Sequence, residues 1–133
     1  MRRREILLVA AMLVALVAVA GVALAETLTG NDRDNRLIGS NQRDSISGGG
    51  GDGLIKGLRS IDSLNGGAGN DDTYAGPRDE RARDTVVCGR GKDFVQVFNR
   101  PAAKDVVNCG KDRDRVVADS EDVLSDCERK RRP

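Results

Sequence analysis

The sequence contains no histidine and no tryptophan, and aromatic residues make up only 2% of its 133 positions. Without histidine the chain cannot build a Ser-His-Asp or Cys-His catalytic group, and it lacks the imidazole ligands that zinc and related metals often use. The shortage of large rings argues against an ordinary globule and against a platform on which nucleic-acid bases stack. We therefore expect neither an enzyme nor a nucleic-acid-binding protein.

An excess of charge of one sign is also missing. Lysine and arginine number 22 against 21 aspartates and glutamates, which gives a formal net charge of +1. The glycine run at 48–51 is not a phosphate-binding loop, because no Lys-Ser or Lys-Thr follows it. Because the basic residues are scattered, nothing favours a polyanion as a partner.

The chain does have a period of nine residues between positions 28 and 73. Each unit begins with an apolar residue, has glycine at its third place and usually has aspartate at its eighth. The first column is Leu28, Leu37, Ile46, Ile55, Leu64 and then Thr73, the third is Gly30, Gly39, Gly48, Gly57 and Gly66, and the eighth is Asn35, Asp44, Gly53, Asp62 and Asp71. A fixed period of this kind is typical of stacked repeats.

One apolar residue in nine cannot form an amphipathic helix, but it suits a short strand followed by a glycine-containing turn. Two such units close one flat coil, and successive coils pair about 4.8 Å apart as a parallel ladder. The apolar column then forms a thin core that only stacking completes. We predict an all-β fold, a right-handed parallel β-roll or β-solenoid built from nine-residue half-coils. Its inward residues are Leu37, Ile46, Ile55 and Leu64.

The aspartate column suggests a bound cation. Asp44 and Asp62 are eighteen residues apart, so they lie on the same side of adjacent coils. Two carboxylates at about 4.8 Å repel by roughly 0.9 kcal/mol in water, and a cation between the coils removes that repulsion. Carboxylate and backbone carbonyl oxygens are hard ligands of the kind that calcium prefers. The regular spacing also favours turn formers and Ca²⁺ ligands over catalytic acids and bases.

The segment GGAGNDDTY at 66–74 matches the pattern G-G-x-G-x-D-x-U-x. It resembles the repeat of the hemolysin-type calcium-binding (repeats-in-toxin, RTX) proteins. The resemblance implies a parallel β-roll with Ca²⁺ between its turns. The ligands would be Asp71 with the carbonyls of Gly66, Gly67 and Gly69. We expect Asp62 and Asp44 to follow as ligands. Other copies keep fewer motif residues, and Gly53 replaces the aspartate of its copy.

From residue 84 the repeat continues as D-x-V units. They are Asp84/Val86, Asp93/Val95, Asp105/Val107, Asp114/Val116 and Asp122/Leu124, with gaps of 9, 12, 9 and 8 residues. We expect their apolar members to point inward. The segment GRGKDFV keeps most of the motif, so Asp93 with the turn of Gly89 and Gly91 is the best candidate Ca²⁺ site in this half.

These patterns divide the chain into five segments. Residues 26–76 form the regular array, 77–83 a surface loop of about four inserted residues, 84–127 the degenerate coils, and 128–133 a disordered basic tail. Residues 1–25 have three arginines, then an apolar run at 6–24 and an A-x-A site, which predicts a signal peptide. The alternative is an uncleaved membrane anchor. We expect a secreted or envelope location, with membrane contact only if this segment is kept.

Three cysteines lie in the second half of the chain. If the D-x-V units begin corresponding half-coils, the cysteines fall near one column, within disulfide range between adjacent coils. We favour Cys109–Cys127, eighteen residues apart, which leaves Cys88 as the odd thiol; Cys88–Cys109 is the alternative. A metal site of three cysteines is not expected, because a fourth soft ligand is missing.

Two functions fit these observations. The first is an exported, non-catalytic calcium-binding repeat protein whose folding Ca²⁺ drives. The second is a passive structural or surface-interaction β-solenoid with vestigial calcium sites. The sequence does not indicate a protein partner for either function.

Overall fold

The computed structural model describes residues 24–77 and 81–131, and within these ranges strands are the only regular secondary structure. In most half-coils a short strand forms around one inward apolar residue, and Thr73 takes this place in one of them. The strands are β1 (Thr27–Thr29), β2 (Arg36–Ile38), β3 (Ser45–Ser47), β4 (Leu54–Lys56), β5 (Ser63–Ala68), β6 (Asp72–Tyr74), β7 (Thr85–Arg90), β8 (Phe94–Gln96), β9 (Val106–Asn108), β10 (Arg115–Val117), β11 (Val123–Ser125) and β12 (Arg129–Arg131).

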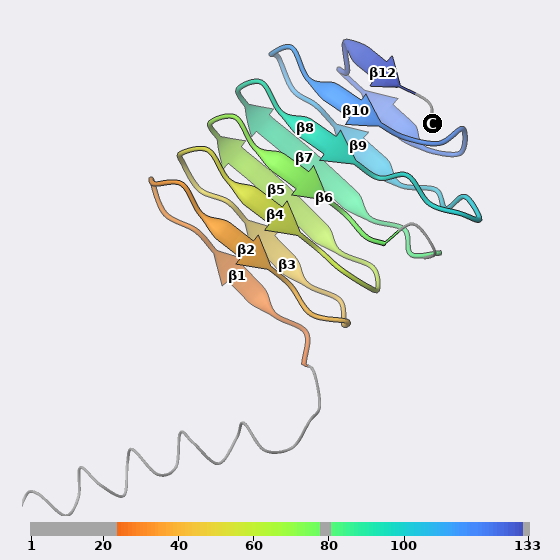
Figure 1. Cartoon of the computed structure of the whole chain (residues 1–133), viewed down its shortest axis with the longest axis horizontal. Helices are drawn as coiled ribbons and strands as arrows, with labels where there is room; N and C mark the ends of the chain where they lie inside the picture. Colours follow the sequence, from red (N-terminus) through yellow and green to blue (C-terminus); the bar gives the residue numbers. More distant parts are fainter. Residues whose placement is uncertain (1–23, 78–80, 132–133) are drawn as a thin grey trace, which may run out of the picture.

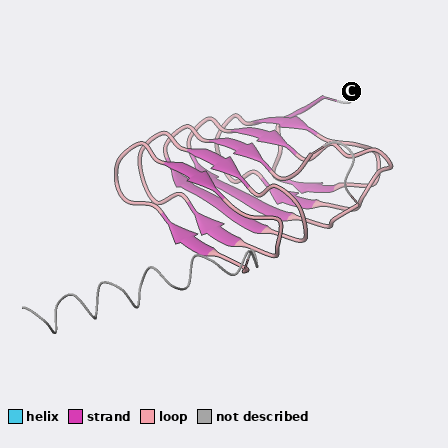
Figure 2. Ribbon diagram, turned by 60° about the horizontal axis from the view of Figure 1, so that its bottom comes forward, coloured by secondary structure: helices cyan, strands magenta, loops and turns pink. Residues whose placement is uncertain are grey.

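The strands form two parallel sheets. The odd-numbered strands make one sheet in the order β1-β3-β5-β7-β9-β11, and the even-numbered strands make the other in the order β2-β4-β6-β8-β10-β12. Each coil therefore gives one strand to each sheet, and the coils stack along one axis (Figure 1). The sheets face each other, with turns along both edges (Figure 2). The predicted all-β parallel β-solenoid is confirmed.

The register shows where the regular period ends. β3 pairs with β5 with Ser45 opposite Ser63, an offset of eighteen residues. β5 pairs with β7 with Ser63 opposite Thr85, an offset of twenty-two. The four extra residues fall where the sequence predicts an inserted loop, and residues 78–80 of that loop lie outside the described residues. β7 pairs with β9 with Thr85 opposite Val106, three residues more than eighteen, which places a second insertion within 97–105.

The core is a single stack of inward side chains between the two sheets. Its buried members include Ile46, Ile55, Leu64, Val86, Val95, Val107 and Val116. Leu28 and Leu37 at one end and Leu124 at the other pack against this core but are only partly buried, because an end coil has a neighbour on one side only. The predicted inward column is therefore confirmed.

The C-terminal segment differs from its prediction. Residues 129–131, placed by the sequence in a disordered tail, form β12 and pair in parallel with β10, with Arg115 opposite Arg129. The edge strand of a sheet has unpaired N–H and C=O groups that can pair with an extended segment nearby. The disulfide of Cys127 keeps residues 129–131 close to this edge.

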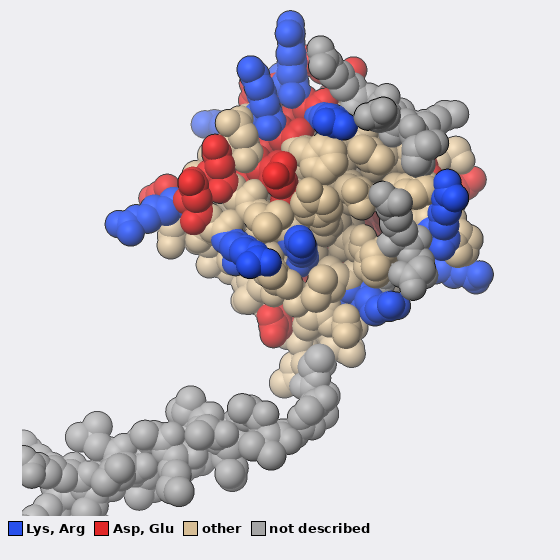
Figure 3. Space-filling model, viewed as in Figure 1, with Lys and Arg blue, Asp and Glu red and all other residues tan. Residues whose placement is uncertain are grey.

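No helix in the described part of the chain is long and apolar enough to cross a bilayer. The predicted signal segment lies outside the described residues except for Leu24 and Ala25. On the face seen in Figure 3, acidic and basic side chains lie among uncharged ones, in keeping with the near-zero net charge of the chain.

Candidate metal centre

The turns of the solenoid fall on two edges, which differ in sequence. The glycine edge comprises the turns that lead from the odd-numbered to the even-numbered strands: 30–35, 48–53, 66–71, 88–93, 109–114 and 126–128. The loop edge comprises the opposite turns: 39–44, 57–62, 118–122, and the described parts of 75–84 and 97–105, which hold both insertions.

Backbone geometry explains the glycines of the glycine edge. Gly67 and Gly69 have φ values of 101° and 119°, and Gly89 and Gly91 repeat this pair at 103° and 128° in the next coil. Residues other than glycine rarely adopt such positive φ values. The coils also lie close together, since a Cβ atom at Gly89 would be 2.0 Å from the carbonyl oxygen of Gly67. The predicted ligand-turn glycines therefore form one stacked set of turns.

Three buried aspartates run along the glycine edge in a column. One oxygen of each carboxylate accepts a hydrogen bond from the backbone N–H in the preceding coil. The N···O distances are 2.7 Å from Gly53 to Asp71, 2.7 Å from Asp71 to Asp93, and 2.8 Å from Asp93 to Asp114. The other oxygen, Oδ2, has no hydrogen-bond partner in the part of the chain that the structure describes. A buried carboxylate with one unused oxygen is unfavourable unless it takes up a proton or a cation.

The ionisation of this column reflects its surroundings. The pKa of Asp93 is raised from 3.8 to about 7, mainly by burial and also by the neighbouring carboxylates of Asp114 and Asp71, against the lowering effect of the backbone N–H of Asp71. The pKa values of Asp71 and Asp114 are also raised, mainly by burial. Ionisation of these carboxylates is therefore unfavourable unless a positively charged group lies beside them.

The loop edge holds a second column of buried aspartates, which accept the same kind of hydrogen bond. The carboxylates of Asp44, Asp62, Asp84, Asp105 and Asp122 accept the backbone N–H of the residue one coil earlier, at 2.7 to 3.0 Å. The Asp44 carboxylate also accepts the N–H of Ser40 at 2.5 Å. These donors offset the repulsion that the spacing of Asp44 and Asp62 would otherwise cause.

The sequence-derived ligand set is thus divided between the two edges. Asp71 and Asp93 lie in adjacent coils of the glycine edge, together with the turns of Gly66, Gly67, Gly69, Gly89 and Gly91. Asp44 and Asp62 lie on the loop edge. The sequence-derived set omitted Asp114, the third member of the first column. The signal for it was present in the sequence, because Gly110, Asp114 and Val116 keep the motif spacing.

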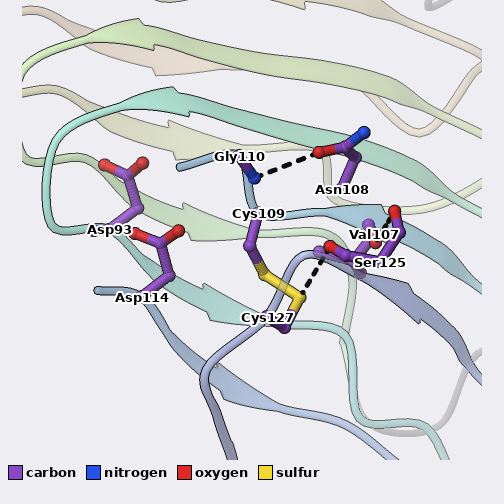
Figure 4. The surroundings of a disulfide bond; sticks show 8 residues. All are labelled: Asp93, Val107, Asn108, Cys109, Gly110, Asp114, Ser125 and Cys127. Carbon is purple, nitrogen blue, oxygen red and sulfur yellow. Dashed lines mark hydrogen bonds between the residues drawn. A yellow bond between two sulfur atoms is a disulfide. The ribbon is translucent and has the colours of Figure 1, made fainter. Parts of the chain in front are cut away.

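The cysteines follow the preferred prediction. Cys109 and Cys127 form a disulfide with a Cα–Cα distance of 5.1 Å, and Cys88 is a buried free thiol. Figure 4 shows Asp93 and Asp114 beside this disulfide. The pKa of Cys88 is raised from 9.0 to about 12, mainly by burial and also by the carboxylates of Asp114, Asp93 and Asp71.

Comparison with protein families finds one match, which covers turns of both edges. The family model of the RTX calcium-binding nonapeptide repeat (four copies) matches residues 21–55 and 48–77. Residues 21–77, which include Asp44, Asp62 and Asp71, are therefore similar to RTX calcium-binding nonapeptide repeats, and the coils beyond residue 77 continue the same stack in register. A search of curated proteins found no match.

The residues of the glycine edge fit calcium. The donors are carboxylate oxygens, two of which are the unused Oδ2 atoms of Asp71 and Asp93, and the backbone carbonyls of two glycine turns. All are oxygen ligands on turns, which is the donor chemistry of calcium sites. The RTX repeats and the parallel solenoid together support a calcium-binding repeat protein.

Proposed function

We propose that the chain is an exported calcium-binding repeat protein without catalytic activity, in which Ca²⁺ between the turns of the glycine edge drives folding. One observation carries this proposal. Asp71 and Asp93 are 1% and 3% exposed, lie in adjacent coils, and each has an oxygen without a hydrogen-bond partner among the described residues.

Each group of the glycine edge has a distinct task in this proposal. Asp71 and Asp93 would hold the cation together with the carbonyls of the turns 66–69 and 89–91. The hydrogen bond from the N–H of Asp71 to Asp93 orients the Asp93 carboxylate before any metal arrives. The bound cation would supply the positive charge that these buried carboxylates lack. Asp62 and Asp44, on the loop edge, would form a weaker second site, because the Asp44 carboxylate already accepts N–H groups from Glu26 and Ser40.

The thin core explains why folding would depend on the metal. Ordering about 100 residues costs on the order of 100–200 kcal/mol of chain entropy. The core that offsets this cost is one column of mostly valine, isoleucine and leucine side chains. An affinity on the order of 10⁻⁴–10⁻³ M, as in extracellular modules, would delay folding until the chain meets external calcium. The apolar run before residue 25 supports export.

Calcium titration followed by far-UV circular dichroism and calorimetry tests the proposal. In chelator at neutral pH we expect a marginally stable fold with a weak β-signal, and with Ca²⁺ a cooperative gain of β-signal and of stability. The double variant Asp71→Asn/Asp93→Asn should lose this response, because each amide keeps an acceptor oxygen but loses the charge. Asp52→Asn is the matched control, since Asp52 is exposed and lies outside the buried column. Equal responses of the double variant and the control would overturn the assignment.

The alternative function, a passive structural β-solenoid, also has an observation in its favour. On the loop edge, backbone N–H groups of the preceding coil hold the aspartates without any metal. If chelator leaves both the circular dichroism and the melting temperature unchanged, this alternative is correct.

A further inference from the structure

The three cysteines of the chain lie on three successive coils at one end of the solenoid. Val86 pairs with Val107, and two residues further along β7 (Thr85–Arg90) this register places Cys88 beside Cys109. The disulfide joins Cys109 to Cys127 in the following coil. A group bound by all three sulfurs would therefore tie these three coils together.

A fourth side chain meets this column from the glycine edge. The sulfurs of Cys88 and Cys109 and a carboxylate oxygen of Asp114 all lie within 4.8 Å of one another. In the described part of the chain this is the one such cluster of three cysteine or acidic side chains. Its members are almost fully buried, at 1%, 0% and 0% exposure respectively.

Asp114 gives independent evidence of a missing partner. Its Oδ1 accepts the N–H of Asp93 at 2.8 Å, which fixes the orientation of the carboxylate. Its Oδ2 has no hydrogen-bond partner among the described residues. The sequence argued against a three-cysteine metal site because a fourth soft ligand was missing; Asp114 offers a hard carboxylate oxygen instead, a ligand that zinc also accepts.

We propose that the reduced chain binds one thiophilic divalent cation, best matched by Zn²⁺, through Cys88, Cys109, Cys127 and Asp114. Three thiolates and one carboxylate make a tetrahedral donor set suited to zinc, and thiolates select against calcium. Zinc–sulfur bonds of about 2.3 Å in a tetrahedron place the sulfurs about 3.8 Å apart. The ligand atoms of Cys88, Cys109 and Asp114, which lie within 4.8 Å of one another, therefore need movements of only about 1 Å, whereas the sulfur of Cys127 lies outside this group and must turn toward it once the disulfide is broken. Reduction leaves the sulfur of Cys127 next to that of Cys109 as the remaining ligand.

The metal and the disulfide exclude each other, because both use Cys109 and Cys127. A dithiol reductant gives two electrons and two protons to the disulfide and leaves as its own disulfide. Zinc then displaces the protons of the three thiols, which pass to solvent. Reoxidation of Cys109 and Cys127 by an external disulfide, which takes the two electrons, together with two protons from solvent, and leaves as two thiols, removes two ligands and releases the metal. The last coils thus have one cross-link under reducing conditions and another under oxidising conditions.

Cobalt(II) is a suitable probe, because tetrahedral thiolate ligation gives it sulfur-to-metal charge-transfer bands and intense visible bands. The full chain, reduced with a phosphine, should develop these bands with a sharp end point at one equivalent and lose them when Zn²⁺ is added. Excess Ca²⁺ should not displace the cobalt, so this result does not depend on the calcium proposal. The oxidised chain should show no such bands. Absence of the bands in the reduced chain would overturn the inference.

Two variants identify the ligands. Cys88→Ala should weaken Co²⁺ binding at least tenfold. This variant keeps the native disulfide. Alanine fits the position, because the equivalent residue of the preceding coil is the still smaller Gly66. Asp114→Asn should weaken binding too, whereas Asp112→Asn, at an exposed site in the same turn, should not. Circular dichroism of each oxidised variant checks its fold. Unchanged band intensity in Cys88→Ala would rule out the site.

A melting experiment separates a built site from binding by an unfolded chain. Zn²⁺ should raise the melting temperature of the reduced parent, because a ligand of the folded state stabilises it by mass action. It should leave the oxidised parent and the reduced Cys88→Ala variant nearly unchanged. If Zn²⁺ lowers the melting temperature of the reduced parent or leaves it unchanged, the cysteines bind metal only when unfolded and the proposal fails.

Discussion

At the scale of single residues, the aspartates of the repeat have two tasks at once. Asp71 accepts the N–H of Gly53 with one oxygen and leaves the other unused. The first oxygen ties one coil to the one before it, and the second is available to a cation. A repeat aspartate is therefore part of the backbone hydrogen bonding even where no metal binds, which explains why this residue type persists at positions whose motif glycines have changed, such as Asp44.

Asp71→Asn separates these two tasks. Asparagine keeps an acceptor for the N–H of Gly53 but removes the buried charge. In chelator the variant should be as stable as the parent or more stable, whereas in calcium it should bind at least tenfold more weakly. Urea unfolding with and without Ca²⁺ measures both effects. Asp52→Asn should change neither, and a loss of stability in chelator similar to that in calcium would contradict the two-task reading.

Ile55 tests the core at the same scale. Its side chain is fully buried in the stack between the sheets. Ile55→Asp should destabilise by more than about 4 kcal/mol, because it buries an unpaired charge, whereas Ile55→Val should lose only about 1 kcal/mol. Urea midpoints in saturating calcium give both values. If the two variants unfold at similar midpoints, the register of the core is wrong.

At the scale of the half-coil, the turn conformation of the glycine edge recurs on the loop edge without its glycines. In the turn 57–62, Leu58 and Ser60 have φ values of 77° and 86°, the region that Gly67 and Gly69 adopt in the turn 66–71. An L-residue pays roughly 1–2 kcal/mol for this conformation. The turn 57–62, which ends at Asp62, thus has the same backbone conformation as the glycine turn 66–71. Leu58 and Ser60 adopt it with steric strain, because both carry a side chain.

A reciprocal exchange at the fourth place of these turns tests this strain. Ser60→Gly should stabilise by about 0.5–1 kcal/mol, because relief of the left-handed conformation outweighs the added freedom of the unfolded chain. Gly69→Ser should be severely destabilising, since its Cβ would lie 2.1 Å from the carbonyl oxygen of Gly51. Thermal unfolding in calcium compares the two. A destabilised Ser60→Gly variant would show that the serine side chain matters more than the backbone strain.

The half-coil is also the scale at which the sequence was most informative. The apolar columns predicted the strands and the inward residues, because alternation about Ile46 or Ile55 leaves only one face for the core. The same period could have assigned the ligands to the two edges. Asp44 and Asp62 are two half-coils apart and lie on the same edge, whereas Asp71 is three half-coils from Asp44 and lies on the opposite edge. The aspartate-to-backbone ladder and β12 were not predictable, since both depend on which unpaired N–H and C=O groups an adjacent coil presents.

At the scale of the whole molecule, the solenoid is an uneven stack. Its middle coils have neighbours on both sides and fully buried core residues, whereas Leu28, Leu37 and Leu124 in the end coils are only partly buried. The C-terminal end is closed by the Cys109–Cys127 disulfide and by β12. The N-terminal end has no cross-link of this kind among the described residues. We infer that unfolding begins at the N-terminal coils, which amide hydrogen exchange would resolve coil by coil.

The two aspartate columns together determine how the stability of the whole molecule depends on pH. Burial raises the pKa of Asp93 and of Asp105 from 3.8 to about 7. Between about pH 4 and pH 7 the folded chain therefore binds more protons than the unfolded chain. Without calcium, these groups should stabilise the fold most below about pH 4, and the stability should fall as the pH rises to 7. In calcium the trend should weaken or reverse, because the cation replaces the proton at Asp93 and binds better as the carboxylate ionises.

Urea midpoints at pH 5 and pH 8, in chelator and in calcium, measure this dependence. Asp105→Asn is the matched variant, since it removes one of the two strongly shifted groups from the loop edge and leaves the glycine edge intact. In chelator it should flatten the fall between the two pH values, and in calcium it should leave the midpoint at pH 8 the same or higher. A midpoint in chelator that rises from pH 5 to pH 8 would mean that the aspartates are stabilised as anions by their backbone N–H donors. Calcium would then stabilise the fold by mass action alone, without relieving an unfavourable buried charge.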